Sequence, residues 1–268
     1  MSFLSMMFGI KKRSITVSEL KEAFANKEFV FYYQPEWDLK TKRVIGVEAL
    51  MRWKSSKRGF VPPVQFIPLL EKSGLIHNFT GFLFEQTLAD LAELHKIQPD
   101  LFVAVNLSVC QLQEPKLIET IRTNLEKYNI STKYLECELS ESQELTEDIL
   151  SHNALQELSK MGIALSIDDF GTGYSSFARL KQLNLQKLKI DLFFVRKLLK
   201  DTKNQAIVSS MIKLSHDLGF PVLAEGIETT GQQQWLKDNG CDYGQGYWFS
   251  RALPLDQLKL FLTENTKK

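Results

Sequence analysis

Apolar residues form two short runs near the start of the chain, at Phe29–Gln34 and Val44–Leu50. Both runs are rich in aromatic or β-branched residues, which favours β-strands. The polar stretch 38–42 between them is typical of a turn. Only about ten residues separate the two runs, whereas a parallel return needs a crossover of a dozen or more. The pattern therefore predicts an antiparallel hairpin.

Beyond the hairpin, short apolar runs alternate with segments of helical periodicity. The expected strands are 101–107, 134–140, 163–168, 186–190, 221–224 and a short one around 243–249. The expected helices are 18–26, 68–74, 79–97, 115–128, 147–161, 174–183, 204–218, 230–239 and 255–263. This alternation predicts an α/β fold, a (β/α)₈ TIM-like barrel whose first strand is antiparallel to the rest. An open doubly wound sheet is the alternative, which we disfavour because no Gly-rich phosphate loop follows an early strand.

The first ten residues are apolar and are followed by Lys11-Lys12-Arg13. This run is too short for a bilayer, which needs about 20 residues, and a signal peptide carries its positive charge before the apolar run. We expect residues 1–15 to form a flexible tail and 16–268 to form a single domain. A weak membrane contact through Phe3, Met7 and Phe8 is the less favoured alternative.

Composition excludes several classes of protein. The 268 residues carry 33 basic and 32 acidic side chains, so nothing suggests a surface that binds a nucleic-acid polymer. Three widely spaced cysteines form no disulfide framework, which favours a reducing cytoplasm. The four histidines lack zinc-ligand spacing, so we expect any metal to be bound by oxygen.

The stretch Asp168–Ser176 places two adjacent carboxylates directly after the apolar run 163–167, with Gly171 and Gly173 behind them. Adjacent carboxylates repel each other, and bound divalent cations relieve that repulsion. Taken alone, the pair fits a polar turn with a helix-capping aspartate at least as well.

Other polar residues strengthen the metal interpretation, because side chains at the carboxyl ends of parallel barrel strands converge on one mouth. Hard oxygen ligands suit Mg²⁺ or Mn²⁺, and two such ions clamp a phosphodiester for in-line displacement. The strand-end residues are Glu48, Asn106, Glu138, Asp168, Asp169, Lys189, Asp191 and Glu225.

With these residues in place, the chain resembles the EAL-domain cyclic di-GMP phosphodiesterases over roughly residue 19 to the C-terminus. Seven strings in family order are very specific. They are Glu48–Trp53 (EALMRW), Asn106-Leu107-Ser108, Glu138–Ser142 (ELSES), Asp168–Ser176, Lys189-Ile190-Asp191, Ala224–Thr229 (AEGIET) and Gly244–Tyr247 (GQGY).

The resemblance implies a role for each matching residue. Glu48, Asn106, Glu138 and Asp168 would hold one metal ion, and Asp168, Asp169 and Glu225 a second. The metals would activate a water, with Lys189 beside it and Glu225 assisting its deprotonation. Glu141 would anchor the loop 168–176, which in this family links metal occupancy to dimer contacts. The substrate pocket would comprise Gln34, Leu50, Arg52, Asp191, Glu228 and Gln245, with Asp191 and Glu228 in supporting positions.

The resemblance further implies hydrolysis of cyclic di-GMP to linear pGpG with two Mg²⁺ or Mn²⁺ ions, inhibition by Ca²⁺, and a homodimer. Departures from the family pattern are Ser140, Cys110, Leu192, Phe193 and Ala252, none of which removes a metal ligand. Two alternatives remain. One is a silent domain that serves as a cyclic di-GMP receptor or binds a protein, and the other is a barrel hydrolase for a different phosphodiester.

Two structural expectations follow from these assignments. Residues two apart on a strand face the same side, so Glu136 and Lys187 should meet inside the barrel, one layer below Glu138 and Lys189. The dimer interface is expected at the helix with Tyr174, Phe177 and Leu180 and at 192–195, although these apolar residues could equally belong to the core.

Overall fold

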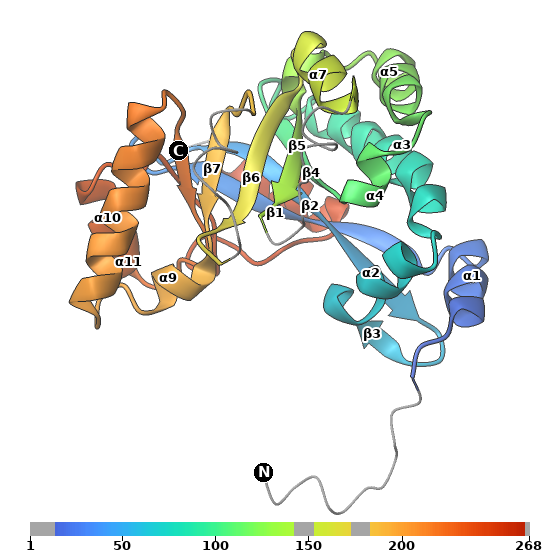
Figure 1. The fold of residues 1–268 in the computed structure, drawn as a ribbon, viewed down its shortest axis with the longest axis horizontal. Helices are drawn as coiled ribbons and strands as arrows, with labels where there is room; N and C mark the ends of the chain where they lie inside the picture. The colour runs from blue at the N-terminus through green and yellow to red at the C-terminus, as the bar shows by residue number, and fades with distance from the viewer. Residues whose placement is uncertain (1–13, 142–152, 173–182, 266–268) are drawn as a thin grey trace, which may run out of the picture.

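The computed structural model describes residues 14–141, 153–172 and 183–265 (Figure 1). Eight strands close into a barrel in the order β1-β9-β8-β7-β6-β5-β4-β2, because β1 also pairs with β2. Strand β1 is antiparallel to both of its neighbours, and the remaining barrel pairs are parallel. The strands are β1 (Phe29–Asp38), β2 (Val44–Ser55), β4 (Phe102–Leu107), β5 (Leu135–Ser140), β6 (Ala164–Phe170), β7 (Lys187–Ile190), β8 (Val222–Ala224) and β9 (Tyr243–Gly244), with β3 (Gly59–Val61) outside the barrel. The predicted barrel with a reversed first strand is confirmed.

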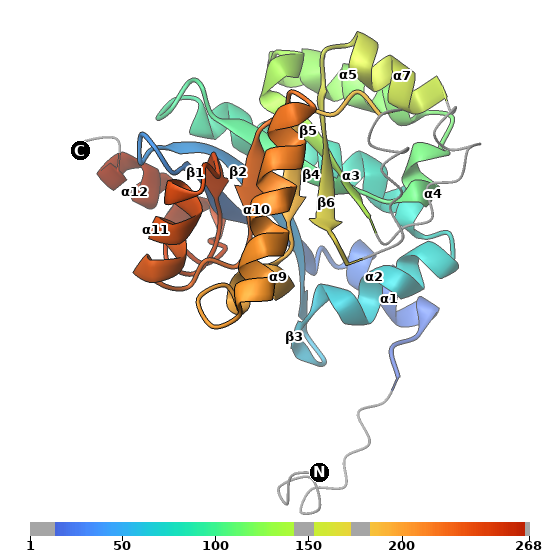
Figure 2. The same cartoon turned by 60° about the vertical axis from the view of Figure 1, so that its left-hand side comes forward.

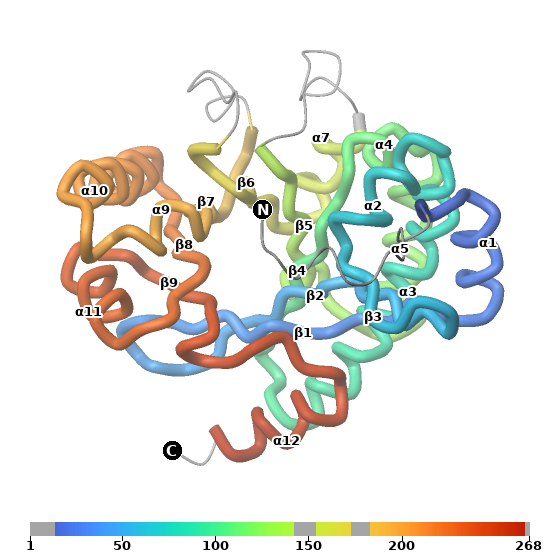
Figure 3. Tube along the Cα trace, turned by 90° about the horizontal axis from the view of Figure 1, so that it is seen from below, coloured from blue at the N-terminus to red at the C-terminus, as the bar shows by residue number. Residues whose placement is uncertain are grey.

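Helices cover the outside of the barrel in two groups. In Figures 1 and 2, α3, α5 and α7 lie beyond β4, β5 and β6, and in Figure 3 α9, α10 and α11 lie beside β7 and β8. Helix α12 lies on the outer side of β1 (Figure 3). The bounds are α1 (Val17–Ala25), α2 (Pro63–Lys72), α3 (Ile76–Leu94), α4 (Val109–Leu112), α5 (Leu117–Tyr128), α7 (Asn153–Lys160), α9 (Leu192–Arg196), α10 (Thr202–Asp217), α11 (Thr230–Asp238) and α12 (Leu255–Asn265), with a 3₁₀ turn at Thr132–Tyr134. None of the helices in the described ranges is long and apolar enough to cross a membrane.

Several predicted boundaries were wrong. Helix α2 begins at Pro63, where a proline fits the first helical position, and continues through Pro68. Strand β6 continues to Phe170. The last strand is only Tyr243–Gly244. Helix α9 was missed, although the Asp191 side chain caps it by accepting from Phe193 N at 2.8 Å. The predicted helix 174–183 lies almost wholly outside the described residues, as do 147–152 of the helix predicted at 147–161.

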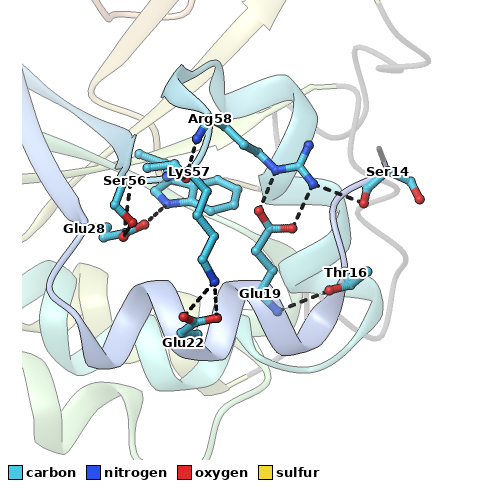
Figure 4. A network of polar contacts seen from close by, with 10 residues as sticks. Ser14, Thr16, Glu19, Glu22, Glu28, Ser56, Lys57 and Arg58 are labelled. Atoms are coloured by element: carbon cyan, nitrogen blue, oxygen red, sulfur yellow. Dashed lines mark hydrogen bonds and ion pairs between the residues drawn. The ribbon is translucent and has the colours of Figure 1, made fainter. Parts of the chain in front are cut away.

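The first hairpin is longer than predicted and supports an accessory lobe, formed by β3, α1 and α2. Its core is a second apolar cluster that includes Leu20, Phe29, Trp53 and Phe66. Figure 4 shows the polar contacts that fasten α1 to the turn between β2 and β3. Arg58 donates to both carboxylate oxygens of Glu19, at 2.5 and 2.9 Å. The lobe places α2 beside the barrel mouth, where its residues line a pocket together with Glu48 and Asp168.

Gly46 leaves room for the ring of Phe102, which packs against its backbone. A Cβ at this position would lie 2.3 Å from the ring of Phe102, its partner on β4. We expect Gly46→Ala to lower the free energy of unfolding by about 1–3 kcal/mol through overpacking. Gly81→Ala is the control, because a Cβ there meets nothing within 4 Å and alanine favours the α3 helix. Urea denaturation of both variants checks this, and equal stability of Gly46→Ala and the parent protein would contradict it.

Candidate active site

The strand-end residues predicted from the sequence do converge at one mouth of the barrel. Their common centre is the ammonium of Lys189 on β7, which is fully buried. Its Nζ lies 2.8 Å from Glu225, 2.9 Å from Glu138, 3.3 Å from Asp168 and 3.4 Å from Glu48. We call these four carboxylates the acid ring. Side chains from four strands or their ends therefore meet around the lysine of a fifth strand.

Two overlapping groups of carboxylates could hold a cation. Oxygens of Glu48, Glu138 and Asp168 lie within 4.8 Å of one another, as do those of Asp168, Asp169 and Glu225. These five acids against Lys189 leave a formal charge of −4, which two divalent cations would balance. Glu138 Oε1 is buried and lacks a hydrogen-bond partner in the described part of the chain. The donor set therefore fits two hard divalent ions that share Asp168.

Burial and crowding perturb the pKa values of these acids. Burial raises the pKa of Glu138 and of Glu225 well above the usual range, and Lys189 opposes the shift in both. In Glu48, Lys189 and two amide donors outweigh burial and lower the pKa. Burial, with repulsion from Asp168 and Asp191, raises the pKa of Asp169 to about 6. Burial disfavours the charged form of Lys189, but the surrounding carboxylates raise its pKa overall.

Two amides orient Glu48. Asn106 Nδ2 donates to Glu48 Oε1 at 2.8 Å, and Gln245 Nε2 donates to Glu48 Oε2 at 3.0 Å. The amide of Gln245, expected to contact substrate, thus already has a protein partner at the acid ring. The Nε2 group of Gln34 likewise donates to Ser250 O at 3.2 Å.

The backbone after Asp168 is bent so that both carboxylates of the pair face the site. Asp169 adopts φ +58° and Gly171 φ +98°, and the latter suits glycine. Glu141 Oε2 accepts from Gly171 N at 2.5 Å and from Thr172 N at 3.1 Å. Glu141 therefore holds the backbone of residues 171 and 172, at the end of the described part of the predicted loop. Residues 173–176 of that loop lie outside the described residues.

Two pockets open on either side of the acid ring. The larger, about 510 Å³, includes Arg52 together with α2 residues of the accessory lobe. The smaller, about 240 Å³, includes Gln34, Arg196, Glu228, Gln245 and Tyr247. Glu48, Leu50 and Asp168 line both pockets, so the ring stands at their junction. Of the predicted substrate residues, only Asp191 lines neither pocket.

Sequence reasoning missed two side chains of the smaller pocket. Arg196 is exposed, and it has no partner among the residues that the structure describes. It lies at the end of α9, the helix that went unpredicted. Tyr247 is 57% exposed, and the Arg251 guanidinium lies 4.0 Å from its ring centroid. The GQGY string gave a signal for Tyr247, but exposure was not predictable from it.

A second ionic cluster lies below the acid ring. Lys187 Nζ is 2.8 Å from Glu136, which confirms the predicted contact. The same nitrogen is 2.6 Å from Glu36 of β1, a residue that sequence reasoning missed. Extending the alternation from Gln34 by two positions would have placed Glu36 in the interior.

The expected dimer segment is divided between core and surface. Phe193 is 52% exposed, whereas Phe194 and Val195 are buried. Tyr174, Phe177 and Leu180 lie outside the described residues.

The raised pKa of Asp169 makes cation binding depend on pH. Below about pH 6 this carboxyl carries a proton that a cation must displace, so Mn²⁺ affinity should rise as pH increases from 5 to 7. Because the folded pKa exceeds the unfolded one, the metal-free protein should also lose stability as pH rises from about 4 to 6. Calorimetry and thermal unfolding with and without Mn²⁺ check both trends. In Asp169→Asn, the Mn²⁺ affinity and the metal-free stability should both depend less on pH. A Mn²⁺ affinity of the parent protein that does not change between pH 5 and 7 would contradict the assignment.

Comparison with known proteins gives consistent matches. The family model described as "EAL domain" matches residues 17–252. The Bifunctional diguanylate cyclase/cyclic di-GMP phosphodiesterase MucR of Pseudomonas aeruginosa is 36% identical over 255 residues, covering 95% of this chain and 37% of that protein. The Signaling protein YkoW of Bacillus subtilis is 38% identical, covering 91% of this chain and 31% of that protein. The chain thus spans about a third of the length of these curated relatives.

Solved structures match about nine-tenths of the chain. The structure of the PaMucR phosphodiesterase in complex with c-di-GMP has a TM-score of 0.85 and 37% identity, covering 90% of this chain and 98% of that one. The EAL enzyme Bd1971 in its form with cAMP and cyclic-di-GMP bound has a TM-score of 0.87 and 34% identity, covering 91% and 67%.

Proposed function

The chain belongs to the EAL domain family, and from this premise we propose that it is a metal-dependent phosphodiesterase that hydrolyses cyclic di-GMP to linear pGpG in bacterial second-messenger signalling. The observation that carries the proposal is the position of the acid ring, at the junction of two pockets. A cyclic dinucleotide with one phosphodiester at the ring would extend a guanylyl arm into each pocket. Relatives named as cyclic di-GMP phosphodiesterases support the substrate class.

The acids would hold two Mg²⁺ or Mn²⁺ ions. Glu48, Asn106, Glu138 and Asp168 would bind the first, and Asp168, Asp169 and Glu225 the second. When bound, such ions polarise the phosphodiester and lower the pKa of a water molecule. Ca²⁺, which is larger and less strict in geometry, would support binding but inhibit turnover.

The chain's own residues would then carry out the remaining steps. Lys189, which contacts the acid ring, would stabilise negative charge on the attacked phosphodiester. Glu225 lies 2.8 Å from Lys189, which places its carboxylate beside the attacked group, where it would accept the proton of the attacking water. Glu141 would keep the backbone after Asp169 in place, since it accepts from two consecutive N–H groups.

The smaller pocket has the chemistry of a guanine site. Arg196 and Glu228 both line it, and neither forms an ion pair within the described ranges. Guanine offers acceptors at O6 and N7 for an arginine and donors at N1 and N2 for a carboxylate. Arg52, in the larger pocket, is the matching cation on the other side of the ring.

We extend the proposal to assembly and domain limits. Residues 16–268 would form one domain, with 1–15 as a tail, and two copies would pair through 174–180 and the exposed Phe193. The protein would act in the cytoplasm. A silent receptor would bind cyclic di-GMP without cleaving it, but the complete set of carboxylates favours the enzyme.

Hydrolysis and binding should separate under mutation. Glu48→Ala removes a metal ligand and Lys189→Ala removes the positive charge beside the attacked group, so each should lower kcat by about 100-fold or more. Chromatographic separation of cyclic di-GMP from pGpG checks this. A Lys189→Ala variant with the parent kcat would contradict the assigned role.

The two pocket arginines should act through binding. We expect Arg52→Ala and Arg196→Met each to weaken cyclic di-GMP binding about tenfold in Ca²⁺, where turnover is low, because each loses a charge-assisted hydrogen bond. Lys197→Met is the control for Arg196, since this neighbouring side chain does not line the pocket. Equal affinities of Arg196→Met and Lys197→Met would exclude Arg196 from the site.

A further inference from the structure

The ionic cluster below the acid ring has no part in the proposed chemistry, yet it is almost completely enclosed. Lys187, Glu36 and Glu136 are 3%, 0% and 6% exposed. They come from three different strands, β7, β1 and β5, and meet across the barrel interior at 2.6 and 2.8 Å. The ring of Phe102 lies beneath, with its centroid 5.0 Å from Lys187 Nζ. We call these three charged residues the lower triad.

The lower triad and the acid ring share two strands. Lys187 and Lys189 project from the same face of β7, and Glu136 and Glu138 from the same face of β5. These are the two buried lysines of the described chain. Each layer therefore has one lysine, although both layers have more carboxylates than ammonium groups.

Removing Lys187 alone would leave two buried carboxylates without a counter-charge, which is a costly state. Lys189 is then the remaining buried lysine among the residues that the structure describes, and it already contacts Glu138 at 2.9 Å. When two divalent cations balance four of the five negative charges at the mouth, the layer without Lys187 is the more negative of the two, and the long flexible stem of Lys189 lets its ammonium move toward it. Glu36 Oε1 is buried and lacks a hydrogen-bond partner within the described residues, so it could receive such a donor.

We propose that Lys187 is a positioning residue, which neutralises Glu36 and Glu136 so that Lys189 stays in the acid ring. The proposal rests on the proposed function for the role of Lys189. The lower triad would thus affect turnover only through its charge balance. If all three charged groups are removed together, nothing below the ring attracts Lys189, and it should stay in place.

The first test is Lys187→Met. We expect kcat to fall about tenfold or more, as Lys189 leaves the attacked group, while KM changes less than about threefold because both pockets are intact. Mn²⁺ should bind several-fold more tightly, because the acid ring loses a competing positive charge. A merely structural loosening would weaken Mn²⁺ binding and turnover together, and that result, or an unchanged kcat, would overturn the proposal.

The second test is the triple variant Glu36→Met/Glu136→Met/Lys187→Met. With no lower carboxylates to attract it, Lys189 should remain in the ring, so kcat should return to within about threefold of the parent protein. Thermal stability should match or exceed the parent, as often found when a buried ionic cluster becomes apolar. A folded triple variant with a kcat tenfold or more below the parent would overturn the proposal. This test remains valid if Lys187→Met fails to fold.

Tyr33→Phe is the matched control. Tyr33 lies on β1 with Glu36, and its hydroxyl donates to Asp90 of α3 at 2.5 Å in another fully buried polar contact. This variant should lose stability without a change in kcat or Mn²⁺ affinity. If the parent protein does not cleave cyclic di-GMP, the proposed function fails. The position of Lys189 is then tested by the Mn²⁺ affinities of the variants alone. Tighter binding in Lys187→Met than in the triple variant supports the proposal, and equal or weaker binding overturns it.

Discussion

The mouth of this barrel depends on the compensation of buried negative charge. Four carboxylates approach one ammonium group in a space that water barely enters, and a fifth lies beside them. One lysine cannot balance that set, and an uncompensated buried carboxylate is strongly unfavourable. The raised pKa values of Glu138, Glu225 and Asp169 are the consequence in the metal-free protein. A pair of divalent cations is the natural complement to this arrangement.

The charged groups reach the mouth because side chains alternate along each strand and because the strands close into a barrel. Parallel strands β4 to β8 bring their carboxyl ends to one rim, and the antiparallel β1 completes the cylinder beside β2. The same alternation places the lower triad one layer below the acid ring. The long β1–β2 hairpin then supports the accessory lobe, which supplies a wall of the larger pocket. Residues of the barrel and of the lobe therefore meet in the lining of the larger pocket.

Much of this architecture was predictable, because it follows from local periodicity. The reversed first strand followed from a loop too short for a crossover, and the Glu136–Lys187 contact followed from the two-residue repeat of a strand. The helix predicted at 68–74 begins too late, because its first residue is placed at Pro68, whereas α2 begins at Pro63 and continues through Pro68.

Other features depend on tertiary contacts and could not be predicted locally. Glu36 lies past the predicted end of β1, and its partner is 151 residues away. The amide of Gln245 is directed to Glu48 by a contact across 197 residues. The left-handed backbone of Asp169 likewise depends on the packed site around it, since nothing in the sequence requires φ +58° at an aspartate.

We propose that the acid ring hydrolyses cyclic di-GMP with the help of divalent cations. The most direct measurement is incubation of the purified protein with cyclic di-GMP and Mg²⁺ or Mn²⁺, followed by separation of the nucleotides, with EDTA in a parallel sample. We expect linear pGpG as the product, formed in the presence of the metal ion and absent in the sample with EDTA. Binding of cyclic di-GMP without pGpG in either metal would contradict it and would identify the domain as a receptor.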